Sequence, residues 1–251
     1  MLIWLRSALF LLGMVLLMVA FAPCTLLFAA FPLIRRHKIV TQNWTRAVIA
    51  WLRLTCGLDY SVIFKGKLPD TPAIIMSKHQ SAWETLALQL IMPLHVWVLK
   101  RELLWIPIFG WQLRLMGPIA IDRQSRTTAQ KQLLEQGQDR VAQGFWIMIF
   151  PEGTRIAPGN RVPYKYGGAR LACMLDLPIV PIAHNAGEFW PKNAFRKYPG
   201  TVTVVVGEAI YPNGRDHKAL THEVETWIEN EMLQLNGKGP KGVTLQKAKE
   251  I

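Results

Sequence analysis

Apolar and polar positions divide the chain into an apolar amino-terminal run and a longer remainder in which the two kinds alternate. The run from 7 to 34 contains no charged residue and is rich in Leu, Phe, Met and Ala. A helix needs roughly 20 such residues to cross a bilayer, so the run predicts a membrane anchor. Pro23 interrupts it near the middle, which leaves open either a spanning helix or a helical hairpin that re-enters one leaflet.

The flanks of the run indicate its orientation. A basic group at 35–38 closes it whereas Arg6 alone precedes it, so the positive-inside rule predicts that the following domain lies in the cytoplasm. A cleaved signal peptide is the alternative, since 20–22 resembles a cleavage site, but the apolar run continues well beyond that point. Next, 44–58 has apolar residues at near-helical spacing, which indicates an amphipathic helix at the membrane interface or against the core.

From about residue 60 short apolar, β-branched runs alternate with polar helical stretches, a pattern typical of α/β domains. The expected strands are 73–76, 96–99, 119–121, 146–150, 179–183 and 201–206. The expected helices are 82–91, 127–143, 168–175 and 216–235. The predicted fold class is therefore α/β, with a mixed, largely parallel sheet flanked by helices. The chain divides into an anchor with the amphipathic helix (1–58), the α/β domain (59–235) and a basic, flexible tail (236–251).

Charge and cysteine content limit the classes of binding partner and site that the chain can have. The chain carries 29 Lys and Arg against 17 Asp and Glu, a formal charge of +12, so its surface attracts polyanions. The cations lie in small groups beside apolar sequence and no zinc-finger or basic-zipper signature accompanies them, which favours membrane lipids over nucleic acid. The three cysteines are widely spaced with no CxxC, so we expect neither a disulfide framework nor a metal site.

One segment, 74–84, has the pattern of a strand, a short turn and a helix, with His79 and Glu84 at the junction. The two side chains can meet only if His79 precedes the first helical turn, and Ser81 as N-cap would leave it there. A carboxylate bonded to one imidazole nitrogen fixes the tautomer and stabilises the imidazolium, so the pair suits general base catalysis on an alcohol. The alternative is a capping box from Ser81 to Glu84 with no catalytic role.

Two further groups of polar residues follow predicted strands. The segment 150–155 ends with Arg155, whose planar donor fork suits a phosphate, and Thr154 and the Gly153 amide add donors. The alternative is a plain turn with a solvated arginine. Lys100 and Arg101 end another strand before the apolar stretch 103–111, so a phosphate held there would have apolar surface beside it.

These segments together resemble the signature blocks of the glycerolipid acyltransferases, in particular the 1-acylglycerol-3-phosphate acyltransferase branch. His79 is followed by a carboxylate five positions later, as in the first block, and further blocks follow in order. The other matching segments are 100–111, 150–155 and 179–183, with lesser features at 121–123 and 164–169. The resemblance covers roughly 60–185. Two positions depart from it, since Glu84 stands where most members have Asp and Lys78 where Asn is common.

The resemblance implies an enzyme that moves a fatty acyl group from acyl-CoA or acyl carrier protein to the sn-2 hydroxyl of lysophosphatidic acid, giving phosphatidic acid. It implies direct attack on the thioester, assisted by His79 with Glu84, with no cofactor beyond that co-substrate. It also implies that the catalytic domain faces the cytoplasm on a bacterial inner membrane. The residues expected to bind substrate are Lys100, Arg101, Arg123, Glu152, Gly153, Thr154, Arg155 and Lys165.

Other functions compete with this hypothesis. Within the family, the alternative acceptor is another lysophospholipid or a lyso-aminolipid. A serine hydrolase is disfavoured because none of the five serines lies in a Gly-x-Ser-x-Gly elbow. A noncatalytic membrane adaptor would use only the anchor and the basic surface. The remaining histidines lack a partner at the required spacing and are expected at the surface or at strand ends: His37, His95, His184, His217 and His222.

Overall fold

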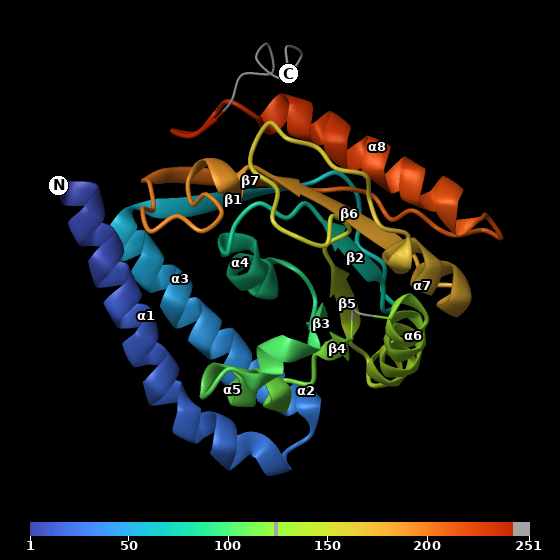
Figure 1. Cartoon of the computed structure of the whole chain (residues 1–251), viewed down its shortest axis with the longest axis horizontal. Helices are drawn as coiled ribbons and strands as arrows, with labels where there is room; N and C mark the ends of the chain where they lie inside the picture. The colour runs from blue at the N-terminus through green and yellow to red at the C-terminus, as the bar shows by residue number, and fades with distance from the viewer. Residues whose placement is uncertain (123–124, 243–251) are drawn as a thin grey trace.

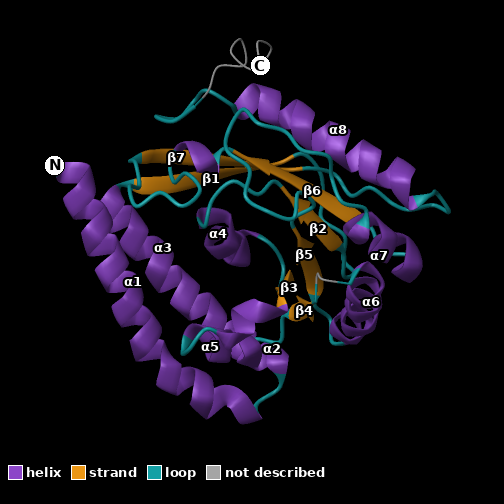
Figure 2. Ribbon diagram, in the orientation of Figure 1, coloured by secondary structure: helices purple, strands orange, loops and turns teal. Residues whose placement is uncertain are grey.

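A seven-stranded sheet forms the centre of the computed structural model, which describes residues 1–122 and 125–242 (Figures 1 and 2). Its strand order is β1-β7-β6-β2-β5-β3-β4, and of these neighbours only β6 and β7 run antiparallel. The strands are β1 Leu58–Phe64, β2 Ile74–Ser77, β3 His95–Lys100, β4 Ile119–Ile121, β5 Trp146–Ile149, β6 Ile179–His184 and β7 Gly200–Val206. The sheet confirms the predicted fold class.

Helices cover both faces of this sheet (Figure 1). They are α1 Leu2–Leu27, α2 Leu33–Arg36, α3 Gln42–Cys56, α4 Trp83–Ile91, α5 Phe109–Leu115, α6 Arg126–Ala142, α7 Gly167–Leu175 and α8 His217–Leu235. Four short turns complete the set: η1 Phe28–Ala30, η2 His37–Thr41, η3 Arg101–Trp105 and η4 Ala186–Glu188. One apolar core joins the sheet to α1, α3 and α4, and a second joins it to α6, α7 and α8, so the sheet is buried on both sides.

The apolar run forms one arm of a helical hairpin. Helix α1 continues through Pro23, the chain turns at Phe28–Ala30, and α3 returns beside α1 (Figure 1). Trp51 of α3 packs on Gly13, where a Cβ would lie 2.0 Å from its ring, and donates a hydrogen bond to the Leu9 carbonyl at 3.2 Å. The reversal therefore falls within the last part of the apolar run, directly after α1, and not at Pro23.

Strand β1 and helix α5 were not among the predicted elements. The end of the amphipathic stretch was assigned to one helix up to residue 58, but α3 stops at Cys56 because Gly57 takes a left-handed conformation with φ 66°. Strand β1 starts directly after it at the sheet edge, where Ile63 and Phe64 stay exposed. Its alternation of burial is weak, which hid it in the sequence.

Part of the predicted flexible tail is bound to the domain. The Gly237 and Gly239 amides each donate to the buried Glu188 carboxylate at 2.6 Å, and the Lys241 amide donates to the Glu188 carbonyl at 3.1 Å. Residues 236–242 thus pack against η4 and do not leave the domain. The last residues, 243–251, lie outside the described part of the chain.

Three of the histidines expected at the surface or at strand ends are buried, His37, His95 and His184, and of the three only His37 lies away from a strand end. His95 does begin β3, but His37 lies inside η2, and both side chains are inaccessible. Burial lowers the pKa of each to about 4, against carbonyl hydrogen bonds that would raise it. The native protein therefore holds both imidazoles neutral at neutral pH.

This burial predicts a loss of stability in mild acid. Between pH 6.5 and about 4 these histidines are protonated in the unfolded chain but neutral in the native protein. Their contribution to the free energy of unfolding is therefore fully present above pH 6.5 and decreases below it, by up to about 3 kcal/mol per histidine. The melting temperature of the purified protein should drop between pH 7.5 and 5. His95→Gln should flatten that slope, while His222→Gln, at an exposed position of α8, should keep it. A slope that stays the same in His95→Gln would contradict the assignment.

Candidate active site

The site lies where two neighbouring parallel strands end. His79 follows β2, and the segment from Phe150 to Arg155 follows β5, which pairs with β2 in parallel. Loops after adjacent parallel strands leave the sheet at the same edge, where open α/β sheets bind ligands. Parallel pairing thus brings together two segments some 70 residues apart, as seen for His79 and Glu152 at a separation of 73.

His79 and Glu84 form the pair that the sequence predicts. The imidazole Nδ1 lies 2.8 Å from Glu84 Oε1, with 14% of the histidine side chain and none of the glutamate exposed. The ring stacks on Phe150, with centroids 3.9 Å apart and planes inclined by 13°. Glu84 and the aromatic ring therefore fix the imidazole from two directions.

Glu84 also binds backbone amides before α4, although the N-cap residue of that helix is Ala82 and not the predicted Ser81. Glu84 Oε1 accepts hydrogen bonds from the Gln80 and Ser81 amides at 2.8 Å each, besides the one from His79. Ser81 Oγ in turn accepts from the Trp83 amide at 3.1 Å, which starts α4. The backbone amides that bind Glu84 before α4 thus also orient its carboxylate towards His79.

The charge state of Glu84 decides which imidazole nitrogen is basic. Burial alone would raise the Glu84 pKa, but the neighbouring His184, the hydrogen bond from His79 and the Ser81 amide outweigh it and hold the pKa below its usual value. An ionised carboxylate can only accept, so Nδ1 carries the proton. The lone pair then resides on Nε2, the nitrogen that can take a proton from a ligand.

His79 lines a cavity of about 910 Å³ whose lining contains both apolar and cationic side chains. Side chains from α3, α4, β3, η3 and α5 form an apolar wall, comprising Trp44, Leu86, Trp97, Leu103, Phe109 and Leu113. The lining also includes four cationic side chains, namely Lys100, Arg155, Lys165 and Arg170. A cavity of this size and composition suits an amphipathic ligand with an anionic head and a long apolar chain.

The structure brings together some of the predicted substrate contacts and not others. Lys100, Gly153, Arg155 and Lys165 line the cavity. Arg101 instead begins η3, pairs with Asp122 at 3.3 Å and does not line the cavity. Thr154 is exposed, and Arg123 lies outside the described residues.

Glu152 does not fit its predicted role as a substrate contact. Its side chain is fully buried, with Oε1 2.9 Å from Lys78 Nζ and Oε2 accepting a hydrogen bond from the His79 amide at 2.7 Å. Burial raises the pKa of Glu152 to about 7 in spite of the neighbouring ammonium. Glu152 therefore holds the backbone of His79.

Sequence reasoning missed two buried residues beside the site. Lys78 is 1% exposed, and the His184 Nε2–H group donates to the Lys78 carbonyl at 2.8 Å. A lysine directly after an apolar strand was the available signal for the first. His184 could not be found, because its contact depends on β6 lying next to β2. No group of three or more His, Cys, Asp or Glu suited to a metal ion occurs in residues 1–122 and 125–242.

Comparison with known proteins gives related results by sequence and by structure. The family model described as Acyltransferase matches residues 61–185. The chain is 43% identical over 223 residues to 1-acyl-sn-glycerol-3-phosphate acyltransferase of Pseudomonas aeruginosa, covering 86% of this chain and 87% of that protein. It is 32% identical to human 1-acyl-sn-glycerol-3-phosphate acyltransferase beta over 191 residues, 72% of this chain and 67% of that one.

A solved structure shares the fold. The crystal structure of the 1-acyl-sn-glycerophosphate (LPA) acyltransferase PlsC from Thermotoga maritima superposes with a TM-score of 0.75. The match covers 92% of this chain and 94% of that one, at 20% sequence identity. The arrangement of sheet and helices is therefore common to both chains.

Proposed function

Because the chain belongs to the acyltransferase family that includes the 1-acyl-sn-glycerol-3-phosphate acyltransferases, we propose that it acylates the sn-2 hydroxyl of lysophosphatidic acid to give phosphatidic acid. The acyl group comes from a thioester, either acyl-CoA or acyl carrier protein. One observation carries the proposal, namely that His79 with its buried carboxylate partner lines a cavity having both an apolar wall and a group of cations.

The chemistry follows from the tautomer of His79. Nε2 takes the proton of the acceptor hydroxyl as its oxygen forms a bond to the thioester carbonyl carbon. The tetrahedral intermediate then collapses, the carbon–sulfur bond breaks, and the departing sulfur takes the proton from the imidazolium. Glu84 stabilises that imidazolium between the two steps. The acyl group moves directly to the acceptor, so no acyl-enzyme forms.

Arg155 is the main candidate for binding the acceptor phosphate. Its Nε is buried and has no hydrogen-bond partner among the described residues, although the side chain lines the cavity. A buried donor without a partner is costly, and a phosphate oxygen would satisfy it in charge-assisted geometry. Lys165 supports this assignment, because its Nζ lies next to Gly153 in the same loop.

Arg155→Ala is expected to raise the KM for lysophosphatidic acid by about 10–10²-fold, from the loss of about 1.5–3 kcal/mol of charged hydrogen bonding, with a smaller change in kcat. Initial rates against acceptor concentration measure the effect. Arg101→Ala is the matched control, since Arg101 is paired with Asp122 outside the cavity lining, and its KM should change little. An acceptor KM that stays at the wild-type value in Arg155→Ala would remove the phosphate from this position.

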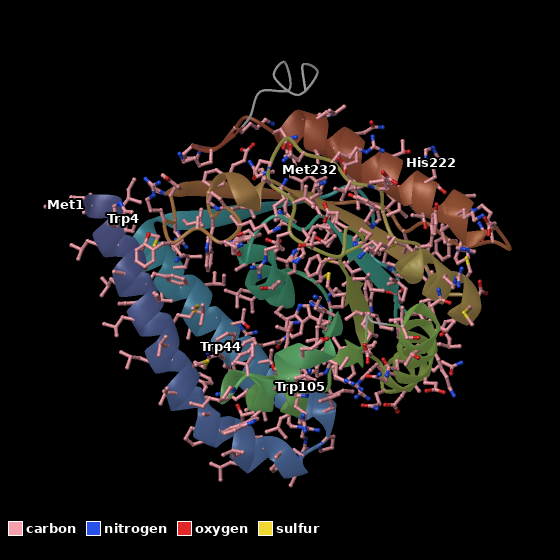
Figure 3. The ribbon with its side chains drawn as sticks, in the orientation of Figure 1. Met1, Trp4, Trp44, Trp105, His222 and Met232 are labelled. Carbon is pink, nitrogen blue, oxygen red and sulfur yellow. The ribbon has the colours of Figure 1, made fainter. Side chains whose placement is uncertain are left out.

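The anchor hairpin supports membrane association. Among the described residues one helix, Leu2–Ala30, is long and apolar enough to cross a membrane. Its exposed side carries leucines at helical spacing, and Trp105, labelled in Figure 3, is 62% exposed on η3 beside the cavity-lining Leu103. In our proposal these groups contact lipid on the bacterial inner membrane and the sheet domain lies on the cytoplasmic side. A membrane-borne acceptor then reaches the cavity without leaving the lipid.

The substrate assignment is tested by assaying purified membranes with a panel of lysolipids and with both thioester donors. We expect lysophosphatidic acid to be the preferred acceptor. The same membranes carrying His79→Ala give the background rate. If lysophosphatidic acid is not acylated while another lysophospholipid or a lyso-aminolipid is, the acceptor proposed here is wrong and the catalytic assignment stands.

A further inference from the structure

A buried cluster of charged residues lies next to the loop between β2 and α4 that carries His79. Lys78 precedes His79 in the chain, and its side chain is 1% exposed. Its Nζ lies 2.9 Å from Glu152 Oε1 and 2.7 Å from Glu229 Oε1. Lysine is almost never fully buried unless it is paired, and removing one partner of such a cluster leaves an uncompensated buried charge. The buried lysine therefore requires both of its carboxylate partners, and it stands directly beside the proposed base.

The cluster grips the backbone of His79. Glu152 Oε2 accepts the His79 N–H at 2.7 Å, and the His79 carbonyl accepts the Ile156 amide at 2.8 Å. Both groups belong to the loop after β5, so that loop holds the His79 residue at both its amide and its carbonyl. The Lys78 carbonyl is in turn held by His184 at 2.8 Å. The direction of the imidazole is set by these backbone contacts together with Glu84.

The ammonium of Lys78 strengthens the hydrogen bond between Glu152 and the His79 amide. Burial alone would lower the pKa of Lys78, but Glu152 and Glu229 outweigh it and hold the pKa above its usual value. The lysine thus stays charged and favours the ionised form of Glu152, which burial disfavours. An ionised carboxylate accepts a stronger and shorter hydrogen bond from the His79 amide than a protonated one does.

The outer end of the cluster is fixed by α8. Glu229 lies on that helix, and its Oε1 also accepts the Tyr164 hydroxyl at 2.8 Å. Lys78, Gln80 and Glu229 line a small cavity of about 140 Å³ between α8 and the loop that follows Arg155. Lys78 therefore connects helix α8 to the loop after β2 that carries His79.

We propose that Lys78 is a positioning residue for His79, acting through Glu152 and itself anchored by Glu229 of α8. The inference rests on the proposed function of His79 as general base. Lys78 touches no substrate in this account. Its removal lets the His79 backbone shift while the cavity's substrate-binding cations keep their places.

The test is a split between kcat and KM in purified Lys78→Met. A misplacement of about 1 Å costs about 10²-fold in rate, so kcat should fall by about 10–10²-fold while the KM values for acceptor and thioester stay near wild type. Lys78→Arg, which restores the charge, should recover most of the lost kcat. A purely structural role would lower the melting temperature without this split. If Lys78→Met fails to fold, Glu229→Gln carries the test, with a smaller fall in kcat and unchanged KM values expected.

The matched control uses a second ion pair that joins α8 to another part of the chain. Lys65 pairs with Glu231, two positions beyond Glu229, and neither residue lines the cavity that holds His79. Lys65→Met should leave kcat unchanged, and an equal fall there would show a general effect of α8 and overturn the inference. A wild-type kcat in Lys78→Met or, where that variant is unfolded, in Glu229→Gln, beside an inactive His79→Ala, would also overturn it while leaving the proposed function intact. Wild-type turnover in His79→Ala would instead overturn the proposed function.

Discussion

His79→Ala is expected to lower kcat for acyl transfer to lysophosphatidic acid by about 10²–10⁴-fold, the range that general base catalysis contributes. The substitution removes the nitrogen that takes the acceptor proton, and the wild-type imidazole is bonded to Glu84 and stacked on Phe150. Substrate binding should persist, because the cations and the apolar wall remain. Steady-state rates with purified protein in lipid or detergent measure the loss.

A matched control separates this effect from damage to the fold. His222→Ala changes an exposed histidine of α8 and should leave both kcat and the melting temperature at their wild-type values. The His79 side chain borders a cavity that already exists, so its alanine variant should still fold. Turnover by folded His79→Ala within a few fold of wild type would exclude the base role, whereas a wild-type protein without acyl transfer would favour the noncatalytic adaptor.

Glu84→Gln is expected to lower kcat by about 10²–10⁴-fold with folding preserved. The amide oxygen can keep accepting from the Gln80 and Ser81 amides, so the start of α4 is retained. What disappears is the negative charge that stabilises the imidazolium and selects the tautomer with a free Nε2. Rates measured alongside circular dichroism separate the two consequences.

Glu84→Asp is the informative companion, because it keeps the charge and shortens the side chain by one methylene. It should retain more activity than Glu84→Gln. The order of the two variants distinguishes a catalytic carboxylate from a helix cap, since either residue can cap α4. Equal and near-wild-type rates in both would reduce Glu84 to its capping role.

The sequence predicted most of the sheet, because its inner strands are short, apolar and bounded by turns. The strand at 119–121 has the predicted bounds, and the others differ by at most one residue at each end. Edge strand β1 was missed because it begins one residue after α3 and buries only part of its residues. The position of the anchor reversal also escaped prediction, since Pro23 stays inside a continuous helix.

For the site, local chemistry was predictable and long-range contacts were not. His79 and Glu84 lie five positions apart and meet because His79 precedes the first turn of α4, as predicted, although the N-cap is Ala82 and not Ser81. Glu152 was wrongly assigned to substrate binding because its carboxylate is turned inwards by Lys78. That role of Lys78 depends in turn on Glu229, which lies 151 positions away in the chain. A pairing over such a separation is set by how α8 packs on the sheet, which no local pattern encodes.

The kinetic order of the reaction tests the central claim most directly. Direct transfer assisted by His79 requires that thioester and acceptor occupy the cavity together. Initial rates measured over a grid of both substrate concentrations should give double-reciprocal lines that intersect. Parallel lines, together with acyl label retained on the protein in the absence of acceptor, would mean that a side-chain nucleophile carries the acyl group and would contradict the account.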